Sequence, residues 1–155
     1  MNYLKIGQKE VLFKAKLLGR DEWIEGLPFY TTNHGKNGAN AVLQMQKMGE
    51  HGDIWMPGFL IEQDSLCEFT GKYDDNHKRI YTGDILHIKY ETNVDFGLVV
   101  FNNDFGCYEI SYPGTMIVSD SIELVDSEIC KVTVIGNIYN VPNFFDNVQE
   151  KKGDK

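Results

Sequence analysis

The chain has 155 residues, of which 42% are hydrophobic and 12% aromatic, a composition that supports one domain with a buried core and excludes an intrinsically disordered protein. Its 15 basic and 23 acidic side chains leave a net charge of −8, which disfavours general binding to nucleic acids or anionic membranes, because such binding needs cations. Three widely separated cysteines do not form a disulfide framework, and no secretory or membrane-spanning apolar segment occurs, so we expect a cytoplasmic protein.

Alternation of apolar and polar residues predicts short strands along most of the chain. In residues 11–17, Phe13, Ala15 and Leu17 fall on one face, and Lys14 and Lys16 fall on the other. Because Pro cannot donate to a ladder, we expect a strand end, edge or bend at each Pro. The same kind of pattern predicts further strands at residues 23–30, 54–62, 66–69, 85–91, 96–101, 105–111, 116–118 and 130–135.

The segment between the second and third predicted strands is the least regular part of the chain. Residues 31–40 are rich in Asn and Gly and are predicted to form a loop without the spacing of a phosphate-binding loop. Residues 41–48 admit two interpretations. They could form a short helix with Asn40 as its N-cap and Gly49 at its end, or a loop followed by a strand.

Residues 69–86 combine several turn signals with the clearest strand pattern in the chain. Gly71 and Gly83 can adopt positive φ at no steric cost, and the polar side chains of residues 74–76 can bond to nearby backbone amides. The strand that follows, residues 85–91, alternates between apolar and polar side chains. These features predict a hairpin that leads into a strand with one buried face.

Short strands separated by turns indicate a mainly β fold, either a small barrel or a sandwich of antiparallel strands. We expect one domain over residues 1–155, in which an N-terminal half (9–66) can be distinguished from a barrel-like C-terminal half (67–145). Pro113 and Gly114 indicate a type II turn at residues 112–115. Pro142 starts a terminal turn that places Phe144 and Phe145 on the core, and a flexible charged tail is predicted at residues 146–155.

The hairpin stretch carries a recognisable pattern at Thr70, Gly71, Asp74, Lys78, Ile80, Tyr81, Gly83, Asp84 and Ile85. This pattern resembles the YopX family, whose members are encoded by phages and prophages of low-GC Gram-positive bacteria. His77 departs from it, since the family has Gly at this position. Residues 13–26 and 134–142 resemble the opening and closing segments of the family. The resemblance implies a phage or prophage origin, and we interpret its signature positions as fold determinants: Gly71, Asp74, Gly83, Asp84, Gly136 and Asn137.

Histidine and cysteine supply the ligand types that zinc prefers, at His34, His51, His77, His87, Cys67, Cys107 and Cys130. No two of them have the close spacing of a structural zinc site, so no metal is expected. No Gly-x-Ser-x-Gly elbow occurs, and Cys107 on its predicted strand is interpreted as a small buried thiol. We therefore predict a protein that is not an enzyme, with no catalytic, cofactor-binding or metal-binding residues.

The strongest local case for nucleic-acid binding is a group of cations interleaved with aromatic residues in the hairpin stretch. Such a surface can grip a single strand. The carboxylates of Asp74, Asp75 and Asp84 offset its positive charge, so we interpret it as a solvated hairpin. The cations and aromatic residues concerned are Lys72, Lys78, Arg79, Tyr73 and Tyr81.

The function predicted from the sequence is a non-enzymatic interaction module that binds a host or phage protein, or a second copy of itself, through exposed strand edges and aromatic hairpins. The alternative is a role related to nucleic acids, either local binding or acidic mimicry of DNA against a host nuclease. A third hypothesis, an enzyme acting on small nucleotides or sugars, requires a deep pocket with convergent polar groups.

Overall fold

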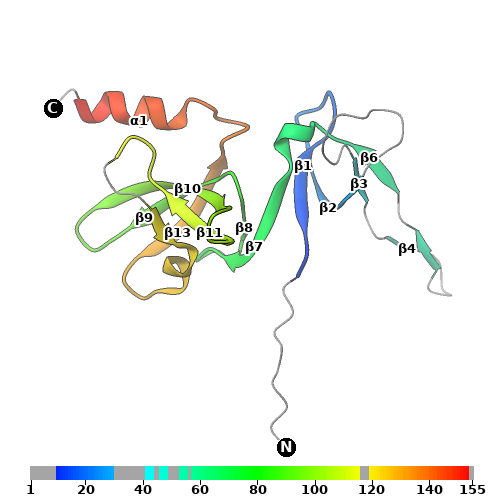
Figure 1. The fold of residues 1–155 in the computed structure, drawn as a ribbon, viewed down its shortest axis with the longest axis horizontal. Helices are drawn as coiled ribbons and strands as arrows, with labels where there is room; N and C mark the ends of the chain where they lie inside the picture. Colours follow the sequence, from blue (N-terminus) through cyan, green and yellow to red (C-terminus); the bar gives the residue numbers. More distant parts are fainter. Residues whose placement is uncertain are drawn as a thin grey trace, which may run out of the picture. The chain divides into compact units, whose positions relative to one another are not determined.

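The computed structural model describes residues 10–29, 41–43, 46–48, 53–55, 57–115 and 119–153. The chain divides into two compact units, Met1–Gly71 and Lys72–Lys155. Both consist mainly of antiparallel strands, so the predicted mainly β fold is confirmed (Figure 1). The predicted loop at residues 31–40 and the predicted strand at 116–118 lie outside the described residues. In the described parts of the chain, no helix is long and apolar enough to cross a membrane.

The first unit contains a sheet that curls back on itself. Its strands β1 (Phe13–Lys16), β2 (Trp23–Phe29), β3 (Ala41–Leu43) and β6 (Gly58–Leu60) lie in the order β6-β3-β2-β1. An antiparallel bridge joins Leu17, just after β1, to Ile61, just after β6. The Leu18 amide donates to the Leu60 carbonyl at 3.0 Å, and the Glu62 amide donates to the Lys16 carbonyl at 2.8 Å. The closed sheet surrounds a core of Ala15, Ile24, Val42 and Ile61.

The predicted short helix at residues 41–48 is wrong. The segment contains β3 and β4 (Gln46–Met48), which agrees with the alternative interpretation as strand. The physical reason is tertiary. β3 pairs with β2 on one side and with β6 on the other, and Val42 is completely buried between them. Pairing on both sides satisfies the backbone and buries a β-branched side chain, which outweighs a weak helical pattern.

The two prolines of this unit lie at the expected kinds of position. Pro28 is the penultimate residue of β2, opposite Val42. Pro57 separates two strands where the sequence predicted one, because β5 (Asp53–Trp55) pairs with β4 and β6 pairs with β3. Pro57 has no amide hydrogen to donate, and it lies where the chain passes from its pairing with β4 to its pairing with β3.

The short 3-10 helix η1 (Gln63–Ser65) connects the first sheet to β7 (Cys67–Tyr73). The hydroxyl of the buried Ser65 accepts a hydrogen bond from the Lys16 amide at 2.8 Å and donates one to the Glu62 carbonyl at 2.6 Å. β7 pairs with β1 and, farther along, with β8 (Arg79–Tyr81) in the hairpin predicted from the sequence. The last residues of β7 and all of β8 belong to the second unit.

The second unit is built on a sheet with the order β12-β11-β10-β9-β13. Leu86 and Ile88 of β9, which lies between β10 and β13, are fully buried, as the alternating pattern predicted. Gly97 of β10 is required by close packing, because a Cβ there would lie 2.2 Å from Cγ2 of Ile110. The strands are β9 (Asp84–Lys89), β10 (Val94–Asn102), β11 (Cys107–Ser111), β12 (Ser119–Ser121) and β13 (Lys131–Asn137). The core contains Ile80, Leu86, Ile88, Val99, Ile110, Tyr112, Ile122, Val125, Cys130 and Val132.

Helix α1 (Phe144–Gly153) occupies most of the segment predicted as a tail at residues 146–155. Its first two residues pack as the sequence suggested, because Phe145 is buried and the Phe144 ring meets the Phe96 ring edge to face at 5.4 Å. The Gln149 amide group donates to the Pro113 carbonyl at 3.2 Å. Figure 1 shows this helix, in orange and red, above β10 in that view. Tertiary contacts therefore hold in helical form a segment whose charge suggested a tail.

Candidate interaction surface

The β10–β11 hairpin presents the most exposed large apolar residue among those described. The strands pair from Leu98 opposite Ser111 to Asn102 opposite Cys107, and residues 103–106 form the turn. Phe105 lies in this turn and is 79% exposed. Phe105 thus buries only a small part of its apolar area within the fold, so packing in the core does not explain it.

Local hydrogen bonds hold the hairpin turn in one conformation. The side-chain oxygen of Asn102 accepts from the backbone amides of Asp104 at 2.9 Å and Phe105 at 3.3 Å. The Gly106 amide donates to the Asn102 carbonyl at 2.8 Å, and Gly106 has a φ of +64°. This arrangement is an Asx turn followed by a left-handed residue, a combination that fixes the backbone without tertiary contacts. Phe105 is therefore held at a preformed tip.

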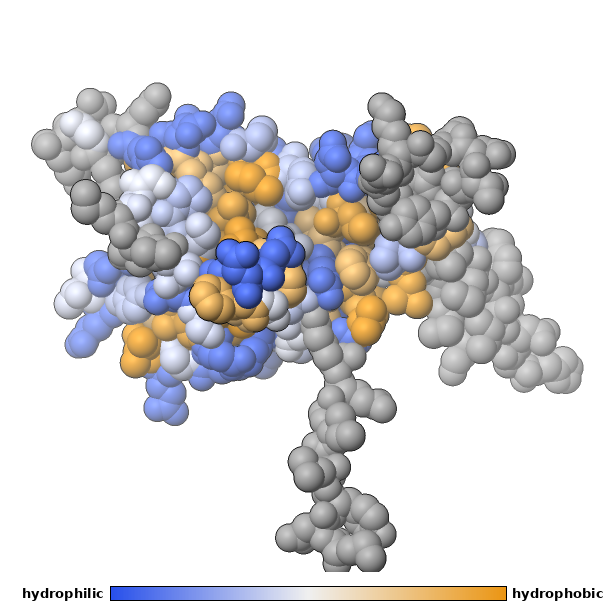
Figure 2. Space-filling view, in the orientation of Figure 1, coloured by the Kyte–Doolittle hydropathy of each residue, from blue (hydrophilic) through white to orange (hydrophobic). Residues whose placement is uncertain are grey.

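An aromatic pair lies on the two strands next to the turn. Phe101 and Tyr108 are directly opposite in the ladder, and their rings meet edge to face at 5.2 Å. Tyr108 packs partly on the core, whereas Phe101 is 42% exposed. Figure 2 shows hydrophobic residues at the surface of the second unit beside strongly hydrophilic ones. We call Phe101, Phe105 and Tyr108 the hairpin aromatic surface.

The charged residues that flank this hairpin in the sequence are all acidic. Residues 90–130 contain no Lys or Arg and eight acidic residues: Glu91, Asp95, Asp104, Glu109, Asp120, Glu123, Asp126 and Glu128. The Glu109 carboxylate accepts from the side-chain amide of Asn102 at 3.1 Å, which places it beside the turn. A hairpin that combines exposed aromatic rings with carboxylates favours a partner whose apolar pocket is bordered by cations.

Behind the hairpin, a hydrogen-bonded pair of groups lies at the edge of the core. The Tyr112 hydroxyl donates to the Asp120 carboxylate at 2.7 Å, so the end of β11 is tied to β12. Burial, followed by this hydrogen bond, raises the pKa of Tyr112 far above its usual value of 10.0. Burial also raises the pKa of Tyr90, which is hydrogen-bonded to Tyr112. Burial thus favours the neutral form of both phenols.

The signature positions Asp84 and Asn137 form a buried polar link. Asp84 is completely buried, and its carboxylate accepts from the Tyr81 amide at 2.8 Å and from the Asn137 side-chain amide at 3.0 Å. Asn137 in turn accepts from the Tyr139 amide at 3.0 Å. Gly83 has a φ of +82°, and a Cβ there would lie 3.3 Å from the Asn137 side chain. These bonds tie the start of β9 to the end of β13, which is the role of a fold determinant.

Asp74 is the second buried signature carboxylate. It accepts from the amides of Asn76 and Lys78, both at 2.9 Å, and so shapes the turn between β7 and β8. His77 in this turn has a φ of +60°, the left-handed conformation for which the family has Gly. Gly71 also adopts a positive φ, of +86°. The signature positions Gly71 and Asp74 therefore set the backbone conformation in and beside this turn.

The residues considered as metal ligands are not brought together by the described structure. His77 lies in the β7–β8 turn, the His87 ring lies tilted at 5.5 Å from the Phe96 ring, and Cys67 and Cys130 are buried. The interpretation of Cys107 as a buried thiol is wrong, because this cysteine starts β11 beside the exposed turn. Among the described residues, no group of His, Cys, Asp or Glu could hold a metal ion. His34 and His51 lie outside the described residues.

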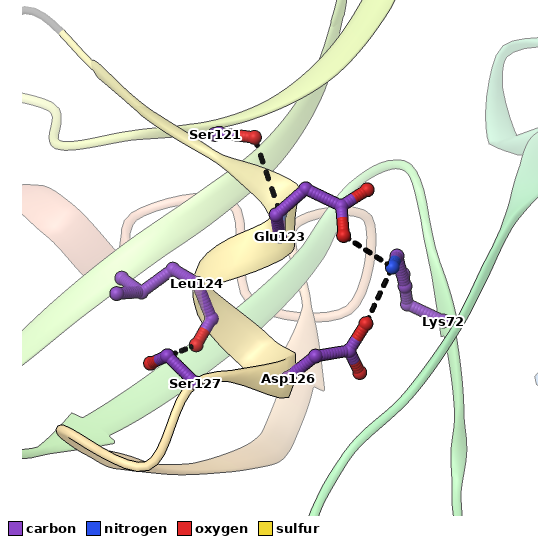
Figure 3. Close-up of polar contacts among 6 residues, drawn as sticks. All are labelled: Lys72, Ser121, Glu123, Leu124, Asp126 and Ser127. Atoms are coloured by element: carbon purple, nitrogen blue, oxygen red, sulfur yellow. Dashed lines mark hydrogen bonds and ion pairs between the residues drawn. The ribbon is translucent and has the colours of Figure 1, made fainter.

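The cationic stretch suggested for nucleic acid is partly neutralised within the second unit. The Lys72 ammonium donates to the Glu123 carboxylate at 2.6 Å and also to the Asp126 carboxylate (Figure 3). Hydrogen bonds to Asp126 and Glu123 raise the pKa of Lys72. Both carboxylates lie on η2 (Ile122–Asp126), whose first turn is capped by the Ser121 hydroxyl. Lys72 therefore acts as an internal clamp between β7 and η2.

One cavity of the second unit, about 320 Å³ in volume, lies at the far end of β9 and β13 from the Asp84–Asn137 link. Two Lys and two Glu residues line it, and Lys89 and Lys131 are directly opposite in the ladder. Tyr90, Ile129 and Cys130 complete the lining. The mixture of charges selects neither an anionic nor a cationic ligand, so we assign no catalytic group to this cavity.

Sequence reasoning missed Phe105 because it placed this residue in the returning strand. The signals that could have found it are local: Asn102 is an Asx-turn former, and Gly106 supplies the left-handed position that ends a hairpin turn. Together they place Phe105 in the turn and leave it no strand neighbour to pack on.

Comparison with known proteins places the chain in a family. A solved structure, the crystal structure of protein EF1440 from Enterococcus faecalis, matches with a TM-score of 0.58 and 18% sequence identity, and the match covers 89% of this chain and 99% of that one. This likeness concerns the fold. No curated protein matches the sequence. The family model described as YopX protein matches residues 23–146, and the chain belongs to the YopX family.

Proposed function

We propose that this YopX family member is a non-enzymatic binding module, encoded by a phage or prophage and acting in the bacterial cytoplasm, that docks on a host or phage protein through its β10–β11 hairpin. The observation that carries the proposal is Phe105, which is 79% exposed on a turn held by its own hydrogen bonds. A preformed aromatic anchor loses little conformational entropy on binding, and such anchors supply much of the affinity of protein interfaces.

The charge of the hairpin region supports a partner with a basic surface. Residues 90–130 are acidic without any Lys or Arg, and Asp104 is exposed directly beside Phe105. A partner surface with Lys or Arg around an apolar pocket would accept the ring and complement the carboxylates. Association with such a partner should slow as ionic strength rises, because the attraction between exposed charges is screened.

A photo-crosslinking experiment in host cells tests this function. A photoreactive phenylalanine analogue replaces Phe105 in one variant and Leu18, which is 52% exposed in the first unit, in a matched control. We expect one protein to crosslink from position 105 and not from position 18, with nuclease treatment making no difference. Equal crosslinking from both positions, or loss of the product after nuclease, would contradict the proposal.

Binding measurements with the identified partner complete the test. Phe105→Ala should weaken binding by at least about 30-fold, as expected for a hot-spot aromatic residue worth roughly 2 kcal/mol or more. Leu18→Ala should leave the affinity unchanged. An affinity that is equal for the two variants would remove the hairpin from the interface.

The acidic segment also favours a second candidate, mimicry of DNA against a nucleic-acid-binding enzyme of the host. Its carboxylates would occupy a basic groove in place of phosphates. Direct nucleic-acid binding by the β7–β8 stretch has weaker support, because Lys72 is bonded to Glu123 and Asp126. Competition separates the two candidates: duplex DNA should displace the chain from a DNA-binding partner under mimicry, whereas it should have no effect on a partner that recognises only the hairpin.

A further inference from the structure

Hydrogen bonds from a turn cover the edge of β13 that faces away from β9, which we call its outer edge. The inner edge of this strand pairs with β9, with Val132 opposite Ile88 and Val134 opposite Leu86. In an antiparallel ladder, alternate residues turn their amide and carbonyl groups away from the partner strand. Such groups on an edge strand form a template on which another strand can add.

The turn between β7 and β8 occupies this template. The Val132 amide donates to the Asp75 carboxylate, and the Asp75 amide donates to the Val132 carbonyl at 2.9 Å. The Val134 amide donates to the Asp74 carboxylate at 2.9 Å. Two outward amides and one outward carbonyl are thus bonded as a neighbouring strand would bond them, although two of the three bonds use side chains.

Hydrogen bonds within the turn hold Asp74 and Asp75 in position along β13. The second oxygen of the Asp74 carboxylate accepts from the amides of Asn76 and Lys78, while the Asp74 amide donates to the Lys78 carbonyl at 2.9 Å. His77 closes the turn in the left-handed conformation, and its amide donates to the Asp74 carbonyl at 2.9 Å. Asp74 is 5% exposed, so water does not compete freely for its oxygens.

We propose that Asp74 and Asp75 act as a substitute strand along β13, and that they prevent a second copy of the chain from pairing through this edge. The proposed occupant of the opened edge is β13 of another copy, because a two-fold antiparallel pair places the same outward groups opposite one another. The proposal stands independently of the hairpin surface, and it gives the signature carboxylates a role in keeping copies apart as well as in shaping the turn.

The test is the association state of variants that lack the carboxylates. In Asp74→Ala/Asp75→Ala, the outward amides of Val132 and Val134 lose their side-chain acceptors. We then expect a concentration-dependent dimer in analytical ultracentrifugation, with residues 131–137 protected from amide exchange at the interface. Asp75→Asn retains an accepting oxygen and should behave as the unchanged chain does. Asp104→Ala, which removes an exposed carboxylate from the hairpin turn, is the matched control.

Two results would overturn the proposal. One is a double alanine variant that is folded by circular dichroism yet sediments as the unchanged chain does at every concentration. The other comes from the unchanged chain, and so remains decisive if the double variant does not fold. The Val132 and Val134 amides should exchange about as slowly as the Thr133 amide of the same strand, and rapid exchange at Val132 and Val134 would show that the carboxylates do not close this edge.

Discussion

The two compact units of this chain close their sheets by different means. In the first, main-chain groups next to Leu17 and Ile61 bond directly, so closure depends on backbone geometry and on a core of small and medium side chains. In the second, carboxylates of Asp74, Asp75 and Asp84 bond to groups on β13. Single polar substitutions should therefore destabilise the second unit strongly, whereas the stability of the first unit should depend mainly on its core.

The largest expected effect comes from breaking the buried link of the second unit. Asp84→Ala removes the carboxylate that accepts from the Tyr81 amide and from the Asn137 side-chain amide. We expect a cost of roughly 2–6 kcal/mol in the free energy of unfolding, since each buried hydrogen bond lost in this way costs about 1–3 kcal/mol. Ser65→Ala, the corresponding change in the first unit, should cost about 1–3 kcal/mol. Urea unfolding followed by circular dichroism measures both. Equal losses would contradict the contrast between the units.

A core substitution in the second unit sharpens the comparison. Leu86→Ala removes a fully buried side chain and should lower the free energy of unfolding by about 2–5 kcal/mol. Both tryptophans, Trp23 and Trp55, belong to the first unit, so tryptophan fluorescence follows that unit alone. We expect the circular dichroism transition to shift more than the fluorescence transition. If the two shift together, the units unfold as one cooperative structure.

Alkaline pH should destabilise the second unit through its buried phenols. The pKa of Tyr112 in the folded chain lies far above its usual value of 10.0, so above pH 10 the unfolded chain releases a proton that the folded chain retains. Stability is therefore unaffected by this group below pH 10 and falls as the pH rises beyond it, by at most about 1.4 kcal/mol per pH unit. Denaturant titrations between pH 9 and 11 measure the slope, and Tyr112→Phe should flatten it. An unchanged slope in that variant would assign the loss to other groups.

The smallest effect is expected at the Lys72 clamp. Glu123 and Asp126 are well exposed, so their bonds to Lys72 are screened by solvent, and Lys72→Met should cost no more than about 1 kcal/mol at low salt. The cost should shrink further in 1 M salt. Thermal unfolding at the two ionic strengths gives the measurement. A loss that is large and independent of salt would mean that the Lys72 stem contributes by packing rather than by charge.

Several elements could be predicted because their signals are local. The alternating residues of β9, the type II turn ending in the hydrogen bond from the Thr115 amide to the Tyr112 carbonyl, and the left-handed conformation of Gly83 are each coded within a few residues. The motif around Asp74 and Asp84 likewise predicted the family and the importance of these positions for the fold. In each case, side-chain periodicity or turn chemistry acts between near neighbours in the sequence.

Other features depend on partners that are distant in the sequence. Residues 41–43 form a strand because β2 and β6 pair with them on both sides. Residues 144–153 form a helix because it packs on Phe96 and bonds to the Pro113 carbonyl. The local sequence of neither segment contains those partners. Phe105 shows a third kind of failure, in which a shift of two residues at the start of β11 moves an aromatic side chain from a strand into a turn.

By itself, the sequence determined the mainly β character of this protein, the hairpin motif, the family and the acidic segment over residues 90–130, because composition, period and turn chemistry are properties of neighbouring residues. Three features depend on the tertiary structure: the first sheet closes on itself, Phe105 lies exposed in a hairpin turn, and Asp74 bonds to a β13 amide 60 residues away. These features arise when segments that are remote in the sequence satisfy one another's backbone groups, and no local pattern records which segments will meet.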